Sequence, residues 1–402
     1  MRAGRGGALE LGAVLTCTVL AQGGLNLARP VLSYRTIALG GGGLAVGLVT
    51  AAYALLSLAV ALPLGRYTDR SGRTAGVLLA GTALLAVGPV ALAVAGDVVA
   101  VAVAATTLGL GHVVYMIGAQ GWVAANSPED QLDRRFGWFT ASVSLGQLTG
   151  PLLGGLVLGD ASGADLVGPT TTAALVAALV SALGLPAALV LLRGGHRHAR
   201  SPAEDADGVV GVGAMLRRPG MRAGLFSSLA LLGAVDLLAA YLPLLAEERD
   251  IAPSVVGALL ALRAGASIAS RLGLGALAQR WSRRTLVVTS SLGAAVALVV
   301  VATPGVGAAV MAPALLIGGF LLGIGQPLTM TIVVRAVPDR ARGAALAVRL
   351  WANRAGQVGL PTVAGITAAG LGASGALWFA AIILLTSAGA ARAGGGASAA
   401  RR

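Results

Sequence analysis

The chain has 402 residues, of which 56% are hydrophobic and only 11% are charged, and its mean hydropathy is +0.84. A soluble domain carries about 25% charged residues, so this composition excludes a water-soluble globular protein and indicates lipid as the solvent. The net charge is +13, and all of the lysine-or-arginine positions are arginine. A charge of this size suggests a nucleic-acid partner until the positions of the arginines are considered.

Apolar runs of about 20 residues are long enough to cross the hydrocarbon core of a bilayer as helices. The sequence predicts twelve of them, at 8–33, 43–64, 75–95, 98–125, 137–159, 168–192, 222–245, 253–278, 285–303, 309–334, 343–368 and 372–391. These runs predict an all-α integral membrane protein.

The arginines between the runs are distributed unevenly. With the N-terminus in the cytoplasm, nearly all of them fall in cytoplasmic loops, and only Arg35 and Arg249 fall on the outer side. Such asymmetry sets the orientation of membrane helices. We therefore predict a multi-pass protein of the cytoplasmic membrane with both termini in the cytoplasm. Because the charge lies in loops that face the membrane surface, a nucleic-acid partner is excluded.

One half of the chain repeats the other. The segment Gly146–Gly155 returns in altered form as Gly356–Gly365, and the same distance separates Gly65 from Gly275. Transporters are often built from two repeated halves with the binding site near their interface. The predicted domains are an N-terminal six-helix bundle at 1–193, a cytoplasmic linker at 194–221, a C-terminal six-helix bundle at 222–391 and a disordered tail at 392–402.

A short charged segment, Gly65-Arg-Tyr-Thr-Asp69-Arg70-Ser-Gly72-Arg73, joins the second and third runs. Gly65 and Gly72 permit tight turns, and Asp69 suits a helix N-terminus, where the dipole favours negative charge. Arg70 and Arg73 can pair with carboxylates or lipid phosphates. An ordinary cytoplasmic loop explains the arginines but not this order of residues.

The fifth run contains a stripe of glycines. Gly146, Gly150 and Gly154 recur every four residues and so line one helix face, with Pro151 and Gly155 beside them. A face without side chains allows very close helix contact, and proline can kink the helix. Tight packing alone is one interpretation of this pattern.

The charged segment, the glycine pattern and the repeated halves together resemble the major facilitator superfamily over almost the whole chain. The resemblance implies two pseudo-symmetric bundles of six helices that work by alternating access. It implies that the segment 65–73 is a cytoplasmic latch, and that the glycine pattern is the antiporter motif, which seals the two halves of exporters. The arginine that proton-coupled drug exporters often carry in the fourth helix is missing, because Ala105 stands there.

Ionisable residues at membrane depth are costly and mark functional sites. Asp236 is the carboxylate nearest the middle of any run, and we expect it to meet Arg263. This pair either couples transport to protons or is a permanent salt bridge, and His112 is a further relay candidate because histidine titrates near neutral pH. The expected substrate cavity is lined by Asn26, Arg29, Tyr53, Tyr115, Gln326, Asn353, Arg354 and Gln357.

The sequence holds no phosphate-binding loop, metal-ligand cluster or nucleophile triad, so we predict neither an enzyme nor a bound cofactor or metal. The expected function is proton-coupled export of a small amphiphilic compound by a monomer. An importer or uniporter for a polar or anionic metabolite is the alternative. A non-transporting membrane sensor would need a folded cytoplasmic domain, and no loop in the sequence is long enough.

Overall fold

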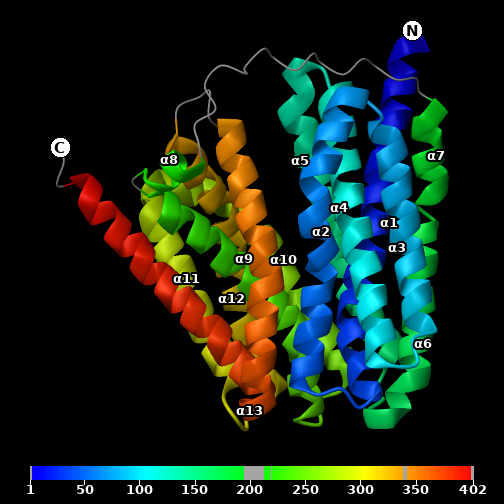
Figure 1. Ribbon diagram of the computed structural model, residues 1–402, viewed down its shortest axis with the longest axis vertical. Helices are drawn as coiled ribbons and strands as arrows, with labels where there is room; N and C mark the ends of the chain where they lie inside the picture. The colour runs from blue at the N-terminus through cyan, green and yellow to red at the C-terminus, as the bar shows by residue number, and fades with distance from the viewer. Residues whose placement is uncertain (1, 194–211, 219, 338–341, 400–402) are drawn as a thin grey trace. The chain divides into compact units, whose positions relative to one another are not determined.

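The computed structural model describes residues 2–193, 212–218, 220–337 and 342–399, and its regular elements there are helices (Figure 1). They are α1 (Arg2–Ala38), α2 (Gly43–Ser71), α3 (Thr74–Ala93), α4 (Val98–Asn126), η1 (Glu129–Gln131), α5 (Leu132–Leu158), η2 (Gly163–Leu166), α6 (Val167–Ala182), α7 (Leu185–Arg193), α8 (Val212–Leu216), α9 (Met221–Glu247), α10 (Pro253–Arg280), α11 (Arg283–Ala302), α12 (Ala308–Arg335) and α13 (Arg342–Ala399). The chain forms two compact units: unit 1 contains 1–41 and 52–205, and unit 2 contains 42–51 and 206–402.

Among the described residues, eleven helical segments are long and apolar enough to cross a membrane. The first ten correspond to the first ten predicted runs, with α6 and α7 together forming the sixth. The eleventh, Ala345–Ala393, contains both of the last two predicted runs within α13. These two limbs meet at Gly372, where φ is 67° and the backbone is not helical. Figure 1 shows the bend between the orange and red limbs.

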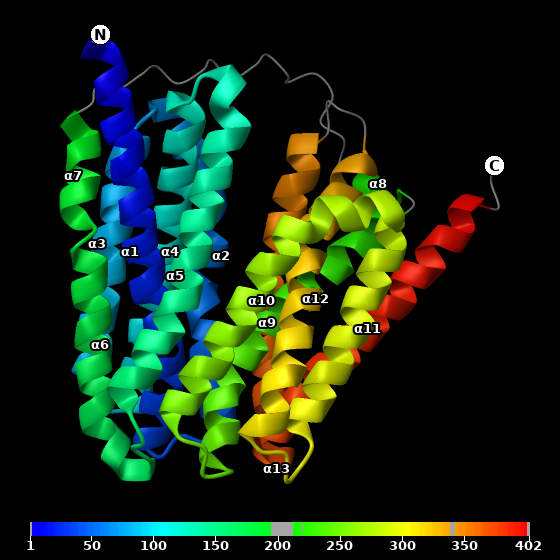
Figure 2. The same cartoon turned by 180° about the vertical axis from the view of Figure 1, so that it is seen from behind.

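The two units repeat the same packing scheme. In unit 1, α1 packs against α5, and α3 packs against α4 and α6; in unit 2, α9 packs against α13, and α11 packs against α12 and α13. Figure 2 shows α1, α6 and α7 of unit 1 from behind, together with α11 and α12 of unit 2. The repeat seen in the sequence is therefore a repeat of helix neighbours.

The glycine stripe of α5 lies against α1. A Cβ added at Gly146 or Gly150 would come within 2.7 Å of backbone atoms of α1, at Gly23 in both cases. A Cβ added at Gly154 would stand 3.5 Å from Leu27, which is ordinary contact. Two of the three glycines are thus required by the close approach of α1 and α5, as tight packing predicts.

The side chain of Arg35 forms hydrogen bonds that connect α1 with α6 and with the end of α3 at one end of unit 1. The sequence places it in a loop, but α1 continues through Pro30 as far as Ala38 and Arg35 is buried. Its Nε and Nη2 donate hydrogen bonds to the Ala95 carbonyl at 3.0 and 2.7 Å, just beyond the end of α3, and its Nη1 donates to the Val167 carbonyl of α6 at 2.8 Å. A cation is favoured beside the C-terminal carbonyls of a helix.

Arg249 does the same in unit 2. It stands at the same distance from Arg35 as Leu322 stands from Leu108. Its guanidinium donates hydrogen bonds to the carbonyls of Val301 and Ala302 at the end of α11, at 2.9 and 3.0 Å, and also to Ser374 of α13. Burial lowers the pKa of Arg249, and the neighbouring Glu248 carboxylate opposes this shift.

Glu248 holds the start of the second limb of α13. Its carboxylate oxygens accept hydrogen bonds from the Ala373 amide at 2.9 and 3.2 Å, directly after the bend at Gly372. An acidic group at the first amide of a helix satisfies a donor that has no partner within the helix.

Three local expectations need correction. Helix α2 continues through Ser71, so Gly65 is helical and only Gly72 makes a turn, with φ of 64°. The side chain of Asp69 lies outside the described ones, and Arg70 is exposed in the last turn of α2. The tail predicted as disordered from 392 is helical as far as Ala399. The linker lies outside the described residues as far as 211, but 212–216 form helix α8.

Candidate functional site

A cluster of polar side chains in unit 1 joins α1, α2 and α4. The Tyr53 hydroxyl of α2 lies 2.7 Å from His112 Nδ1 of α4, and the Arg29 guanidinium of α1 lies 5.1 Å from the centre of the Tyr53 ring. The second distance is short enough for a cation–π contact. One turn before Arg29, the Asn26 amide donates to the Gln22 carbonyl at 2.8 Å.

Gln22 is a member of this cluster that the sequence analysis missed. It is buried on α1, and its Nε2 donates to the Met116 sulfur of α4 at 3.5 Å. Its position four residues before Asn26 on one helix face is the signal that would have found it.

Tyr115 lies in the packing core of unit 1. It is fully buried, and its hydroxyl lies 2.8 Å from the Thr18 hydroxyl of α1. Its place beside a substrate cavity stays a prediction.

The principal polar site of unit 2 is a chain of three side chains. Gln357 Nε2 donates a hydrogen bond to Asp236 Oδ2 at 2.7 Å, and Arg354 Nη1 donates to Gln357 Oε1 at 2.9 Å. Asp236 lies on α9 and is only 4% exposed, whereas Arg354 and Gln357 lie on α13. The Gln357 amide therefore links a buried carboxylate to a guanidinium across two helices.

Polar residues continue along the same face of α13. Arg349, Asn353 and Gln357 are spaced by four residues and so share one face of the helix. Arg349 Nη2 donates to Gln326 Oε1 of α12 at 2.9 Å, and Gln326 Nε2 donates to the Ser228 carbonyl of α9 at 3.2 Å. Together with Asp236, these residues form a set that we call the polar ladder of α9, α12 and α13. Its members are Ser228, Asp236, Gln326, Arg349, Asn353, Arg354 and Gln357.

Three members of the ladder have a buried side-chain atom without a hydrogen-bond partner among the described residues, namely Ser228 Oγ, Arg349 Nε and Asn353 Oδ1, and Asn353 offers the acceptor oxygen of an amide. Its side chain is 6% exposed, and its Oδ1 accepts no hydrogen bond from the residues that the structure describes. A buried acceptor without a donor is costly, so this oxygen is well suited to accept a hydrogen bond from a bound molecule.

The structure gives less information about the other residues that the sequence predicts at the site. Arg263 lies on α10, where its backbone packs closely against Gly319 of α12, and its pairing with Asp236 stays a prediction. Gln326 occupies the position in α12 that His112 occupies in α4, and both make contacts between helices. Among the described residues, there is no group of three or more His, Cys, Asp or Glu that could hold a metal ion.

The chain is similar in sequence to a known protein family. The family profile described as Major Facilitator Superfamily matches twice, over residues 14–250 and 224–393. Among curated proteins, no sequence matches this chain.

Solved structures share the fold at low sequence identity. A nucleoside transporter, NupG, has a TM-score of 0.79 at 13% identity and covers 96% of this chain and 99% of its own. A POT family transporter in complex with 5-aminolevulinic acid has a TM-score of 0.74 at 16% identity, covering 94% of each chain. A bacterial homologue of the human lysosomal transporter Spinster, inward-facing and occupied, has a TM-score of 0.73 at 15% identity, covering 96% of each chain.

Proposed function

Because the chain belongs to the major facilitator superfamily of membrane transporters, we propose that it is a proton-coupled secondary transporter of a small compound that carries an anionic group. It is not an enzyme, and its partners are a small-molecule substrate and the lipid bilayer. The observation that carries the proposal is the hydrogen-bonded chain Arg354–Gln357–Asp236.

The proton is proposed to bind at Asp236. A carboxylate that accepts a hydrogen bond is stabilised in its charged form, whereas one that loses its donor in an apolar setting is better neutralised by a proton. Gln357 is the donor, and its own oxygen is engaged by Arg354. A substrate that draws Arg354 away frees the Gln357 amide to turn, and the Asp236 carboxylate then takes up a proton.

The anionic group of the substrate is proposed to bind Arg354, with Asn353 Oδ1 accepting a hydrogen bond from a donor elsewhere on the same molecule. A guanidinium presents a planar fork that suits a carboxylate. Arg349 extends the positive charge along the same face of α13. The Tyr53–His112 pair of unit 1 is proposed as a second titratable site on the transport path.

Two directions of transport have separate support. Export is favoured by the antiporter-like pattern Gly146–Gly155, and an amphiphilic drug or natural product is then the expected substrate. Import or uniport of a polar metabolite is favoured by Ala105, which stands where proton-coupled exporters often carry arginine. A polar substrate is also in keeping with the neighbours described as a nucleoside transporter and as a POT family transporter in complex with 5-aminolevulinic acid. Drug accumulation in a sensitive host distinguishes them, because only an exporter lowers it.

The proposal is tested with protein reconstituted in vesicles and given a pH gradient. Uptake of labelled candidates that carry a carboxylate is compared between the wild type and Asp236→Asn. The variant keeps the shape of the side chain and one acceptor oxygen for the Gln357 amide but has no titratable group, so we expect gradient-driven uptake to fall to background while exchange of substrate without a gradient continues.

Asp236→Glu is the matched control, because it keeps a titratable carboxylate and is expected to retain part of the gradient-driven uptake. Arg354→Gln is expected to raise the KM for anionic substrates but not for cationic ones. Undiminished gradient-driven uptake by Asp236→Asn would refute proton binding at this residue. A preference for cations in the wild type would refute the assignment of the substrate class.

A further inference from the structure

A basic pocket lies in unit 2, where α8 is followed by α9. Its volume is about 620 Å³, and its lining includes Arg217, Arg218 and Arg222 together with Phe226 and Ala390. The three arginines lie within six residues of chain, just before and within the first turn of α9. The polar ladder is formed by other residues, so this pocket has no part in the proposed transport step.

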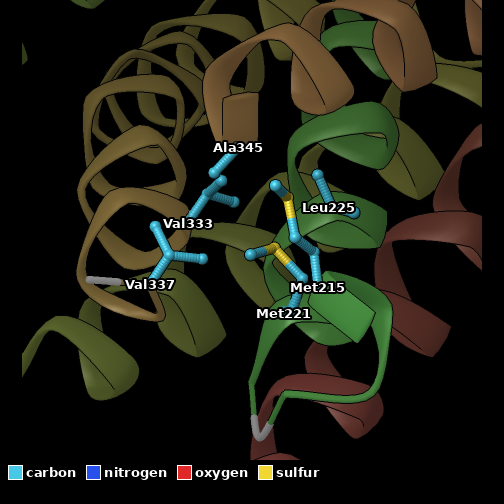
Figure 3. Packing of buried hydrophobic residues seen from close by; sticks show 6 residues of the cluster. All are labelled: Met215, Met221, Leu225, Val333, Val337 and Ala345. Carbon is cyan, nitrogen blue, oxygen red and sulfur yellow. The ribbon is translucent and has the colours of Figure 1, made fainter. Parts of the chain in front are cut away.

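The wall of the pocket is fixed by apolar packing. Met215 of α8 is 1% exposed and lies in a cluster with Met221 and Leu225 of α9 and with Val333 and Val337 at the end of α12. Figure 3 shows both methionine side chains pointing into this cluster. Helix α8 is therefore packed against the ends of the longer helices, and the arginines that follow it are held over a built surface.

The arginines supply three positive charges at one opening. Arg217 and Arg222 are exposed and Arg218 is half-buried. The Arg222 Nε donates to the Leu216 carbonyl at 3.0 Å, which leaves the terminal nitrogens of its guanidinium for other contacts. Three guanidinium groups in one pocket fit the oxygens of a phosphate group, which they can contact through paired hydrogen bonds.

The remaining lining of the pocket is apolar. Phe226 is 36% exposed, and both Phe226 and Ala390 lie inside segments apolar enough to cross a membrane. The pocket thus joins a cationic rim at the end of a spanning helix to an apolar floor that begins at membrane depth. A free phosphate ion satisfies only the rim, whereas an anionic phospholipid satisfies both parts.

We propose that this pocket binds the phosphate headgroup of an anionic phospholipid, with the first part of an acyl chain against Phe226. Each basic residue near a lipid surface contributes about fivefold in affinity. Removal of all three arginines is therefore expected to weaken headgroup binding by roughly 100-fold.

The test uses the full chain, purified in nonionic detergent and titrated with phosphatidylglycerol, phosphatidylcholine or inorganic phosphate, with native mass spectrometry to count the lipids retained. The wild type is expected to retain phosphatidylglycerol in preference to phosphatidylcholine. The variant Arg217→Gln/Arg218→Gln/Arg222→Gln is expected to lose this preference. A variant with Arg217→Gln and Arg218→Gln alone spares the Arg222 contact to Leu216 and is expected to weaken binding by about 25-fold.

The matched control removes the same charge elsewhere in unit 2, as Arg280→Gln/Arg283→Gln/Arg335→Gln. It is expected to keep the preference of the wild type. Equal losses in the two triple variants would show a general effect of surface charge and overturn the proposal. Phe226→Ser is expected to weaken the binding of phosphatidylglycerol but not the binding of inorganic phosphate. Inorganic phosphate that competes fully at concentrations similar to those of the lipid would instead identify a free-anion site and overturn the assignment to a lipid.

Discussion

The contact between α1 and α5 can be tested by adding a single methyl group. In Gly150→Ala, the new Cβ would lie 2.7 Å from the Gly23 carbonyl oxygen and 2.7 Å from the Leu27 amide nitrogen, both of which are backbone atoms of α1. Ordinary contact begins near 3.4 Å, so the helices must separate by about 0.7 Å at this point.

The expected magnitude combines two opposing effects. Overpacking of this kind lowers the stability of the folded protein by about 1–3 kcal/mol. Alanine in place of glycine within a helix raises that stability by about 0.5–1 kcal/mol. The net result for Gly150→Ala is a loss of about 0–2.5 kcal/mol, with a central value of about 1 kcal/mol. For a unit of this size, the central value corresponds to a fall of about 2–4 °C in the midpoint of thermal unfolding.

Gly154→Ala provides the internal control on the same face of α5. Its Cβ would be 3.5 Å from Leu27, so only the gain in helix propensity remains, and the midpoint should stay level or rise. Thermal unfolding of both variants in the same detergent, followed by tryptophan fluorescence, gives the comparison. If Gly150→Ala proves as stable as Gly154→Ala, the close approach of α1 and α5 is not what requires glycine in this motif.

Two further predictions concern contacts between helices in unit 1. Arg35→Met should lower the stability of unit 1 by about 2 kcal/mol, because the Ala95 carbonyl loses both of its hydrogen bonds from the guanidinium. Chemical unfolding in detergent measures this loss. The control variant Arg70→Met, at an exposed position, should leave the stability almost unchanged. Tyr53→Phe removes the hydroxyl that lies 2.7 Å from His112 Nδ1 and should cost about 1 kcal/mol. An unchanged unfolding curve for Tyr53→Phe would show that this contact does not stabilise the fold.

The architecture could be predicted from the sequence because its causes are local. A run of about 20 apolar residues is a helix that spans the bilayer regardless of its neighbours. The repeat is visible because glycines and prolines return at a fixed distance, as Pro151 and Pro361 do. Asp236 and Gln357 could both be predicted as site residues, because a polar side chain within a long apolar run is easily recognised.

The pairing of polar residues could not be predicted in the same way. Sequence places Asp236 on one helix and Gln357 on another, but the rotation of each helix about its axis decides which side chains meet. The apolar run predicts an end near 33, where polar residues follow, yet helix α1 passes through Pro30 and continues to Ala38. Proline is tolerated within membrane helices because neighbouring groups can satisfy the carbonyl that it leaves free. The role of Arg35 was hidden by that misplaced end.

The matching arginines, Arg35 and Arg249, show that the internal repeat extends to the ends of the helices. Each donates hydrogen bonds at the same three helix ends in its own unit, although the surrounding residues differ. The charged segment is less alike in the two halves, since Gln279 stands in the second copy where Asp69 stands in the first. Each unit therefore holds its helix ends together with an arginine of its own.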